Sequence, residues 1–124
     1  IEIRNLVPAP VTIKIFDMVH FEFNPATNTL TCFLKGKFGA DVNDSFAAQL
    51  SVKMEESSMA LPDPGALKIC FDLANTVFIS SSFIRICMIT SRKVSPGHFS
   101  IVNAIPVIKQ TFMIAGLDEL LHVS

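Results

Sequence analysis

A short apolar strand that runs directly into a helix is indicated by the stretch Thr76-Val77-Phe78-Ile79-Ser80-Ser81-Ser82-Phe83. The ten residues that follow, 84–93, contain no Gly or Pro, and they end on Arg92 and Lys93. Basic residues favour the last turn of a helix because they offset the partial negative charge at that end. We therefore expect a strand, a tight junction that exposes hydroxyl groups, and a helix that begins at the serines.

The serines at this junction have two possible roles. A helix N-terminus offers unpaired N–H groups and the positive end of the helix dipole, so a phosphoserine there is stabilised. The alternative is that Ser80 only caps the helix, since a serine hydroxyl at this position accepts a hydrogen bond from a free N–H one turn further on. The junction by itself is compatible with both a regulatory phosphate and an ordinary cap.

Length and composition fit one domain with a buried core. The chain has 124 residues, and domains of this size bury about two-thirds of the surface of the unfolded chain. We expect a single domain over residues 1–124, with residues 1–10 as an N-terminal extension or edge segment. Half of the residues are apolar, but no apolar run approaches the roughly 18 to 20 residues that cross a bilayer.

Charge and cysteine content narrow the classes of partner and compartment. The net charge of −1 comes from 10 basic and 11 acidic residues without clusters of either sign, which disfavours nucleic acid and anionic membranes as partners. Three widely spaced cysteines in apolar runs, Cys32, Cys70 and Cys87, are typical of reduced core thiols. Reduced thiols are typical of the cytoplasm, so we expect a cytoplasmic protein. The printed residues, which begin at Ile1, contain no secretory signal pattern.

Hydrophobic periodicity and turn residues predict the order of the elements. We expect strands at 11–16, 19–23, 29–35, 67–73 and 98–102, of which the first two form a hairpin or a bent strand pair. Leu30, Cys32 and Leu34 should share one face of the third strand, which should end at Gly36. The strand at 67–73 is almost continuously apolar, as in the centre of a sheet.

Two further helices complete the pattern. The spacing of Val42, Phe46, Leu50 and Met54 predicts an amphipathic helix from Asp41, its N-cap, to about Ser57. Another helix should begin at Pro106 and run through Ala115, with Gly116 after its end. Strands come first and then alternate with helices, which predicts an α/β fold with helices packed against a mixed sheet.

Catalytic and metal-binding patterns are weak. His20, His98 and His122 lack metal-ligand spacing with one another and with the cysteines. Ser81 as a nucleophile would need a base and an oxyanion hole, but the Gly-x-Ser-x-Gly elbow is missing. We therefore expect no metal and no cofactor, and a serine hydrolase acting through Ser81 is kept only as an alternative.

Taken in order and spacing, five segments resemble the STAS domain of bacterial anti-sigma factor antagonists: 34–38, 67–73, 77–83, 99–103 and 112–118. The resemblance covers about residues 11–124. It implies a four- to five-stranded mixed sheet with helices mainly on one face, no enzymatic activity, and partner switching. In that family the unphosphorylated antagonist binds an anti-sigma factor that is also a serine kinase, and phosphorylation of one serine breaks the complex. The implied partners are thus a kinase-like anti-sigma factor and a phosphatase.

The family's phosphoacceptor lies in an Asp-Ser-Ser-Gly sequence. The residues that align with it in this chain are Ser80, Ser81, Ser82 and Phe83. The resemblance therefore makes Ser81 the candidate phosphoacceptor. Three positions depart from the pattern: Ser80 replaces the acid, Phe83 replaces the glycine, and Gly39 stands where many members carry an acid. The missing acids remove charges that could orient a hydroxyl or bind a kinase-held metal. Phe83 puts a large ring where a partner backbone could approach glycine closely.

We expect partner binding along the junction and the helix that follows it, at Gly36, Lys37, Gly39, Asp41, Ser80, Ser82, Phe83, Ile84, Cys87 and Asn103. Apolar residues surround almost the whole of the 84–93 helix, and only part of that circumference can face a sheet. A homodimer, the N-terminal segment or a hydrophobic partner would cover the rest. A STAS subunit of a membrane lipid-trafficking transporter remains an alternative function.

Overall fold

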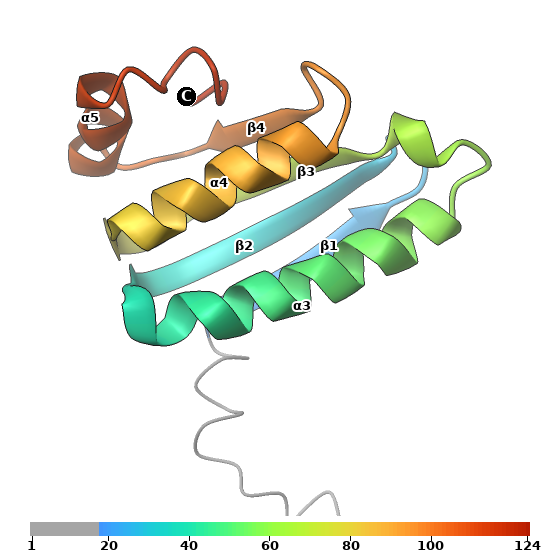
Figure 1. Ribbon diagram of the computed structural model, residues 1–124, viewed down its shortest axis with the longest axis horizontal. Helices are drawn as coiled ribbons and strands as arrows, with labels where there is room; N and C mark the ends of the chain where they lie inside the picture. The colour runs from blue at the N-terminus through green and yellow to red at the C-terminus, as the bar shows by residue number, and fades with distance from the viewer. Residues whose placement is uncertain (1–17) are drawn as a thin grey trace, which may run out of the picture.

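The computed structural model describes residues 18–124 (Figure 1). Its elements are β1 (Val19–Asn24), β2 (Thr29–Phe38), α3 (Ala40–Met59), a 3-10 turn (Pro64–Ala66), β3 (Lys68–Ile79), α4 (Ser81–Lys93), β4 (Phe99–Val102) and α5 (Pro106–Ile114). The strand predicted at 11–16 lies outside the described residues. The order of the other elements agrees with the sequence pattern.

One mixed sheet organises this part of the chain. Its strand order is β1-β2-β3-β4, with β1 antiparallel to β2 and with parallel pairing of β2 with β3 and of β3 with β4. Helices α3 and α4 lie side by side on the same face of the sheet (Figure 1). The predicted α/β architecture, a four-stranded mixed sheet with helices packed mainly on one face, is confirmed.

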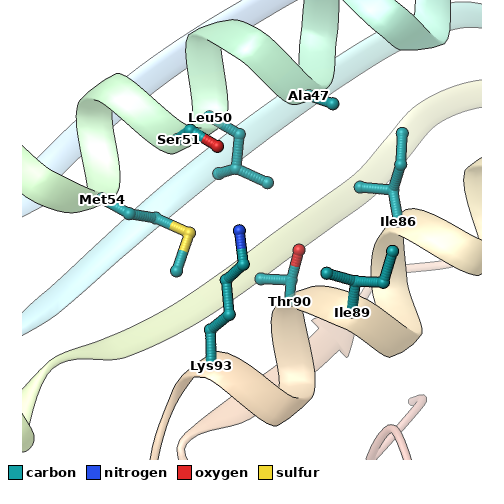
Figure 2. Close-up of a pocket in the computed structure, with 8 residues that line it drawn as sticks. All are labelled: Ala47, Leu50, Ser51, Met54, Ile86, Ile89, Thr90 and Lys93. Carbon is teal, nitrogen blue, oxygen red and sulfur yellow. The ribbon is translucent and has the colours of Figure 1, made fainter.

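Helices α3 and α4 also pack against each other. Side chains from both helices converge on a gap of about 70 Å³ (Figure 2). Ligand pockets usually measure about 300 to 1,000 Å³, so this gap cannot hold a substrate or cofactor. Ile86, from the apolar circumference of α4, lines the gap opposite Leu50 of α3. Helix α3 thus covers part of the apolar surface of α4, for which the sequence alone did not identify a covering element.

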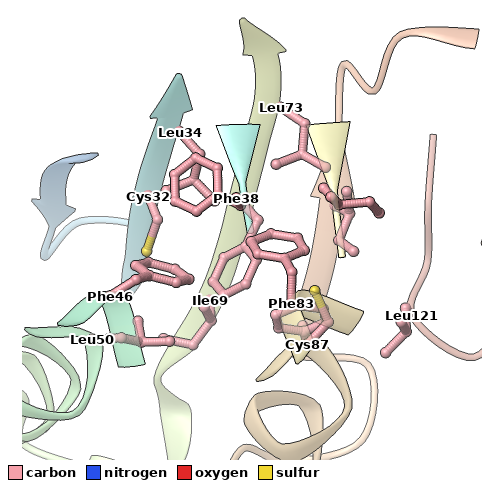
Figure 3. Packing of buried hydrophobic residues seen from close by; sticks show 14 of the residues in the cluster. Cys32, Leu34, Phe38, Phe46, Leu50, Ile69, Leu73, Phe83, Cys87 and Leu121 are labelled. Carbon is pink, nitrogen blue, oxygen red and sulfur yellow. The ribbon is translucent and has the colours of Figure 1, made fainter. Parts of the chain in front are cut away.

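The core lies between the sheet and these two helices (Figure 3). Leu30, Cys32 and Leu34 are all buried, as the period of two predicts. Val42, Phe46 and Leu50 form the buried stripe of α3. All three cysteines are free thiols, with Cys32 and Cys87 buried and Cys70 half-buried. Burial raises the pKa of each thiol above its usual value, so the thiols stay protonated at neutral pH.

Two predicted strand ends are wrong, because β2 and β3 continue through two register shifts, one between Phe33 and Lys35 and one between Gly36 and Lys37. Strand β2 does not end at Gly36 but continues to Phe38, while β3 is continuous from Lys68 to Ile79. Gly36 has φ +98°, a conformation that glycine adopts easily, and it pairs with Thr76 while the next residue, Lys37, pairs with Phe78. Val77 is therefore the extra residue of a β-bulge.

The start of α3 also differs from the prediction. The N-cap is Gly39, and no side chain caps the helix. Asp41 instead lies in the first helical turn, where its charge favours the positive end of the dipole. The helix begins earlier because the backbone turns directly after β2, and it continues to Met59 rather than to about Ser57.

A cluster of four phenylalanines joins β2, α3, β3 and α4: Phe38, Phe46, Phe71 and Phe83, with neighbouring ring centroids 5.4 to 6.1 Å apart. All four are 0% exposed. Each ring therefore contacts side chains from other elements, and the loss of one would leave a cavity between the sheet and the helices.

We predict that Phe83→Ala lowers the free energy of unfolding by about 3 to 5 kcal/mol, because it opens a cavity in a packed core. Phe78→Ala is the matched control, since Phe78 is 48% exposed on the adjoining strand; its cost should stay below about 1.5 kcal/mol. Urea unfolding followed by circular dichroism measures both. Equal losses for the two variants would contradict the assignment of Phe83 to the core.

Candidate functional site

The candidate site lies where β2 and β3 both end and α3 and α4 both begin. Parallel neighbouring strands finish at the same edge of a sheet, so the residues that follow them come together. Gly39 follows β2 and Ser80 follows β3. The Ser80 N–H donates to the Phe38 carbonyl at 3.1 Å, which ties the two junctions to each other.

Ser80 is the N-cap of α4. Its backbone is extended, and its hydroxyl oxygen accepts a hydrogen bond from the Phe83 N–H at 3.4 Å. The same hydroxyl lies 3.1 Å from the Phe38 carbonyl, to which it donates. The capping role considered from the sequence is therefore present at Ser80, which leaves Ser81 and Ser82 as first-turn residues.

Asn43, in the first turns of α3, is the member of the site that the sequence analysis missed. It is 2% exposed, and its Nδ2 donates to the Ser80 hydroxyl at 2.9 Å and to the Ser82 hydroxyl. The two hydroxyl oxygens are 2.8 Å apart. One amide thus joins the start of α3 to both serines. The available signal was the position of Asn43 three residues before Phe46, on the buried face, where an amide needs partners.

Ser81 differs from its two neighbours. Its side chain is exposed, whereas Ser80 and Ser82 are half-buried. Both neighbours are held by Asn43, but among the described residues no hydrogen bond involves the Ser81 hydroxyl. The first turn of α4 contains no acidic residue. The site therefore presents one free hydroxyl at the positive end of a helix.

The structure gathers most of the predicted partner-binding residues at this edge. Gly36 and Lys37 lie near the end of β2, Gly39 follows that strand, and Asp41 lies in the first turn of α3. Ile84 is half-buried in α4. Asn103 lies apart from this group, because it follows β4, whose last residue, Val102, pairs with Asp72 well before β3 ends at Ile79. It is exposed with φ +61°, and its Nδ2 donates to Asp72 Oδ2 at 3.1 Å.

Two predicted contact residues need correction. Phe83 and Cys87 are both 0% exposed, because each points from α4 into the core (Figure 3). Neither side chain can touch a partner while the domain is folded. The large ring that replaces the family's glycine is thus a core residue and leaves the surface beside Ser81 clear.

Two exposed apolar residues beside the site were not predicted. Val77 is 56% and Phe78 is 48% exposed, three and two residues before Ser80 along β3. The bulge at Val77 breaks the alternation of the strand, so two successive side chains face solvent. The sequence indicated only an apolar run at this point.

The described residues offer little for catalysis. The His20 side chain bonds to Glu22, and the His98 side chain bonds to the Leu67 carbonyl. Within residues 18–124, no histidine side chain bonds to a serine hydroxyl. In the same part of the chain, no group of three His, Cys, Asp or Glu side chains comes together to hold a metal. No helix there is both long and apolar enough to cross a bilayer.

Comparison with solved structures identifies the fold. The chain is similar to the anti-sigma factor antagonist SpoIIAA in its unphosphorylated form, with 16% identity over 77% of this chain and 82% of that chain and a TM-score of 0.57. It is also similar to an anti-sigma factor antagonist from Mycobacterium paratuberculosis, with 16% identity over 86% of each chain and a TM-score of 0.66.

The sequence alone matches no model of a protein family and no curated protein. At 16% identity, the similarity to the two antagonists shows that they and this chain share one fold, the STAS fold. The fold implied by the sequence resemblance is therefore confirmed.

We predict that Asn43→Ala lowers the free energy of unfolding by about 1 to 3 kcal/mol, because it removes the partner of two hydroxyls in a partly buried network. Hydrogen exchange at the Phe83 amide should also become faster, since Ser80 caps α4 less firmly. Asp44→Ala, at the next and exposed position of α3, should change stability by less than about 0.5 kcal/mol. Similar values for the two variants would show that the Asn43 bridge has no structural role.

Proposed function

We propose that this chain is a non-catalytic regulatory domain that binds a protein partner and is switched by phosphorylation of Ser81. The observation that carries the proposal is the selective exposure of one hydroxyl. Asn43 holds Ser80 and Ser82, whereas Ser81 is exposed at the first position of a 13-residue helix. A kinase would therefore reach Ser81 without unfolding the junction.

A phosphate at Ser81 is compatible with the fold. Negative groups in the first turn of a helix gain about 0.3 to 1 kcal/mol from the dipole and the free N–H groups. No acid in that turn of α4 would repel it. Phosphorylation adds about −1.5 to −2 units of charge, so the modification would change the surface much more than the stability of the domain.

The surface around Ser81 is suited to binding a protein. Val77 and Phe78 supply exposed apolar area, and Lys37 and Asp41 are exposed polar residues at the end of β2 and the start of α3. Interfaces commonly combine an apolar centre with a polar rim. A doubly charged phosphate next to Phe78 would have to lose its hydration when a partner docks, and this cost would weaken the complex.

The shared fold supports one class of partner. The similarity to two anti-sigma factor antagonists supports an anti-sigma factor with serine kinase activity as the partner, in the cytoplasm, with a phosphatase that reverses the modification. Because Ser80 and Gly39 replace acids of the family pattern, the kinase would have to hold its metal without carboxylates at these two positions. The Ser80 hydroxyl and the Asn43 amide replace those acids in ordering the start of α4.

We predict that Ser81→Glu weakens binding of the native partner at least tenfold relative to Ser81→Ala, with no loss of thermal stability. The partner is the protein that co-purifies with the wild-type chain from the cells that produce it, and calorimetry measures its affinity. Ser51→Glu is the matched control, since it adds the same charge at an exposed position on α3, eleven residues after its start. If Ser81→Glu and Ser81→Ala bind the partner with equal affinity, Ser81 is a first-turn residue without a switching role.

A further inference from the structure

The two edges of the sheet are protected differently. At the β4 edge, the Ile101 N–H donates to the His122 carbonyl at 3.2 Å, and the Ser124 N–H donates to the Ile101 carbonyl at 2.9 Å. The end of the chain thus pairs with that edge strand. Strand β1 pairs with β2 on one side, and no other strand of the described residues pairs with its second side. Such an open edge is a template for pairing with another strand.

An apolar groove runs beside this open edge. It lies between β1 and α3, has a volume of about 440 Å³, and is lined by Val19, Phe21, Ala48, Gln49, Val52 and Lys53. Val52 is 54% exposed. The volume is large enough to accept several side chains, and apolar area of this kind is commonly an interaction surface. A strand that pairs with β1 would place every second side chain over the groove.

The sequence of β1, Val19-His20-Phe21-Glu22-Phe23-Asn24, is complementary to itself. Val19, Phe21 and Phe23 face the helices, whereas His20 and Glu22 are exposed on the opposite face. If two copies pair antiparallel about a two-fold axis at Phe21, Val19 lies opposite Phe23 and His20 lies opposite Glu22. All apolar side chains then share one face, and on the other face each His20 imidazole lies opposite a Glu22 carboxylate, which can accept a hydrogen bond from the ring N–H.

Neighbouring registers lack this complementarity. A shift that keeps the helices of both copies on one side must move the pairing by two residues, since a shift of one would reverse the faces. One such shift brings Glu22 opposite Glu22, and like charges directly opposite each other are destabilising. The other brings His20 opposite His20, which leaves no carboxylate across from either imidazole. One register is therefore favoured.

We propose that β1 pairs antiparallel with β1 of a second copy of this chain, with Phe21 on the two-fold axis. The two sheets become one continuous sheet, and the two α3 helices lie on the same face, where Val52 of each copy closes the groove of the other. Because the Ser81 junction begins after β3, at the end of the inner strands, both switch sites remain open in the dimer. This inference does not depend on the proposed function.

Disulfide trapping tests the register. Directly opposite Cα atoms are about 4.5 to 5.5 Å apart, within the range of a disulfide. In a Cys70→Ser background, Phe21→Cys should give mostly covalent dimer under mild oxidation. Phe23→Cys is the matched control, because in this register its two copies are offset by four residues, about 13 Å. No dimer with Phe21→Cys, or equal dimer with both variants, overturns the proposal.

Charge reversal in the full chain tests the interface without new cysteines. His20→Glu places a second acid opposite Glu22, so the dimer dissociation constant from sedimentation equilibrium should rise at least tenfold. Mixing this variant with the His20→Lys/Glu22→Lys double variant should restore dimers, since acids then face lysines. A wild-type chain that remains monomeric at all concentrations would show that the N-terminal residues or another partner occupy the groove, and would overturn the proposal.

Discussion

The ring of Phe83 packs against Phe38, Phe46 and Phe71, and this contact sets the rotation of α4 about its own axis. Successive helical residues are about 100° apart. With Phe83 directed into the core, Ser82 points sideways toward Asn43, and Ser81, about 200° from Phe83, points away from the core. The burial of one aromatic residue thus determines which serine solvent can reach.

This constraint explains how Ser81 is exposed in a junction that departs from the antagonist motif that it resembles. Phe83, in place of glycine, strengthens the core and adds nothing to the surface. Ser80, in place of an acid, caps α4 through its hydroxyl. Asn43 then holds Ser80 and Ser82 together from the neighbouring helix. The substitutions change how the junction is supported, and the exposed hydroxyl of Ser81 is retained.

Much of the fold could be predicted from periodicity. The alternation of Leu30, Cys32 and Leu34 and the spacing of Phe46 and Leu50 depend only on which face of an element is buried, and the structure confirms both patterns. The continuation of β2 past Gly36 and the exposure of Phe78 could not be predicted, because they result from a bulge formed between two strands that are far apart in sequence. The bridge from Asn43 to the serines spans 37 and 39 residues. A pattern within a short stretch of sequence does not indicate hydrogen bonds between residues that are so far apart in the chain.

The proposal that phosphorylation of the exposed Ser81 switches the domain is tested most directly by locating phosphate on the native chain. The chain would be isolated from the cells that produce it, under several growth conditions and with phosphatase inhibitors, and its phosphorylation mapped by fragmentation mass spectrometry. Selective exposure predicts phosphate on Ser81 and on neither neighbour, at an occupancy that varies with growth condition. Phosphate on Ser80 or Ser82, or an unmodified chain in every condition, would contradict it.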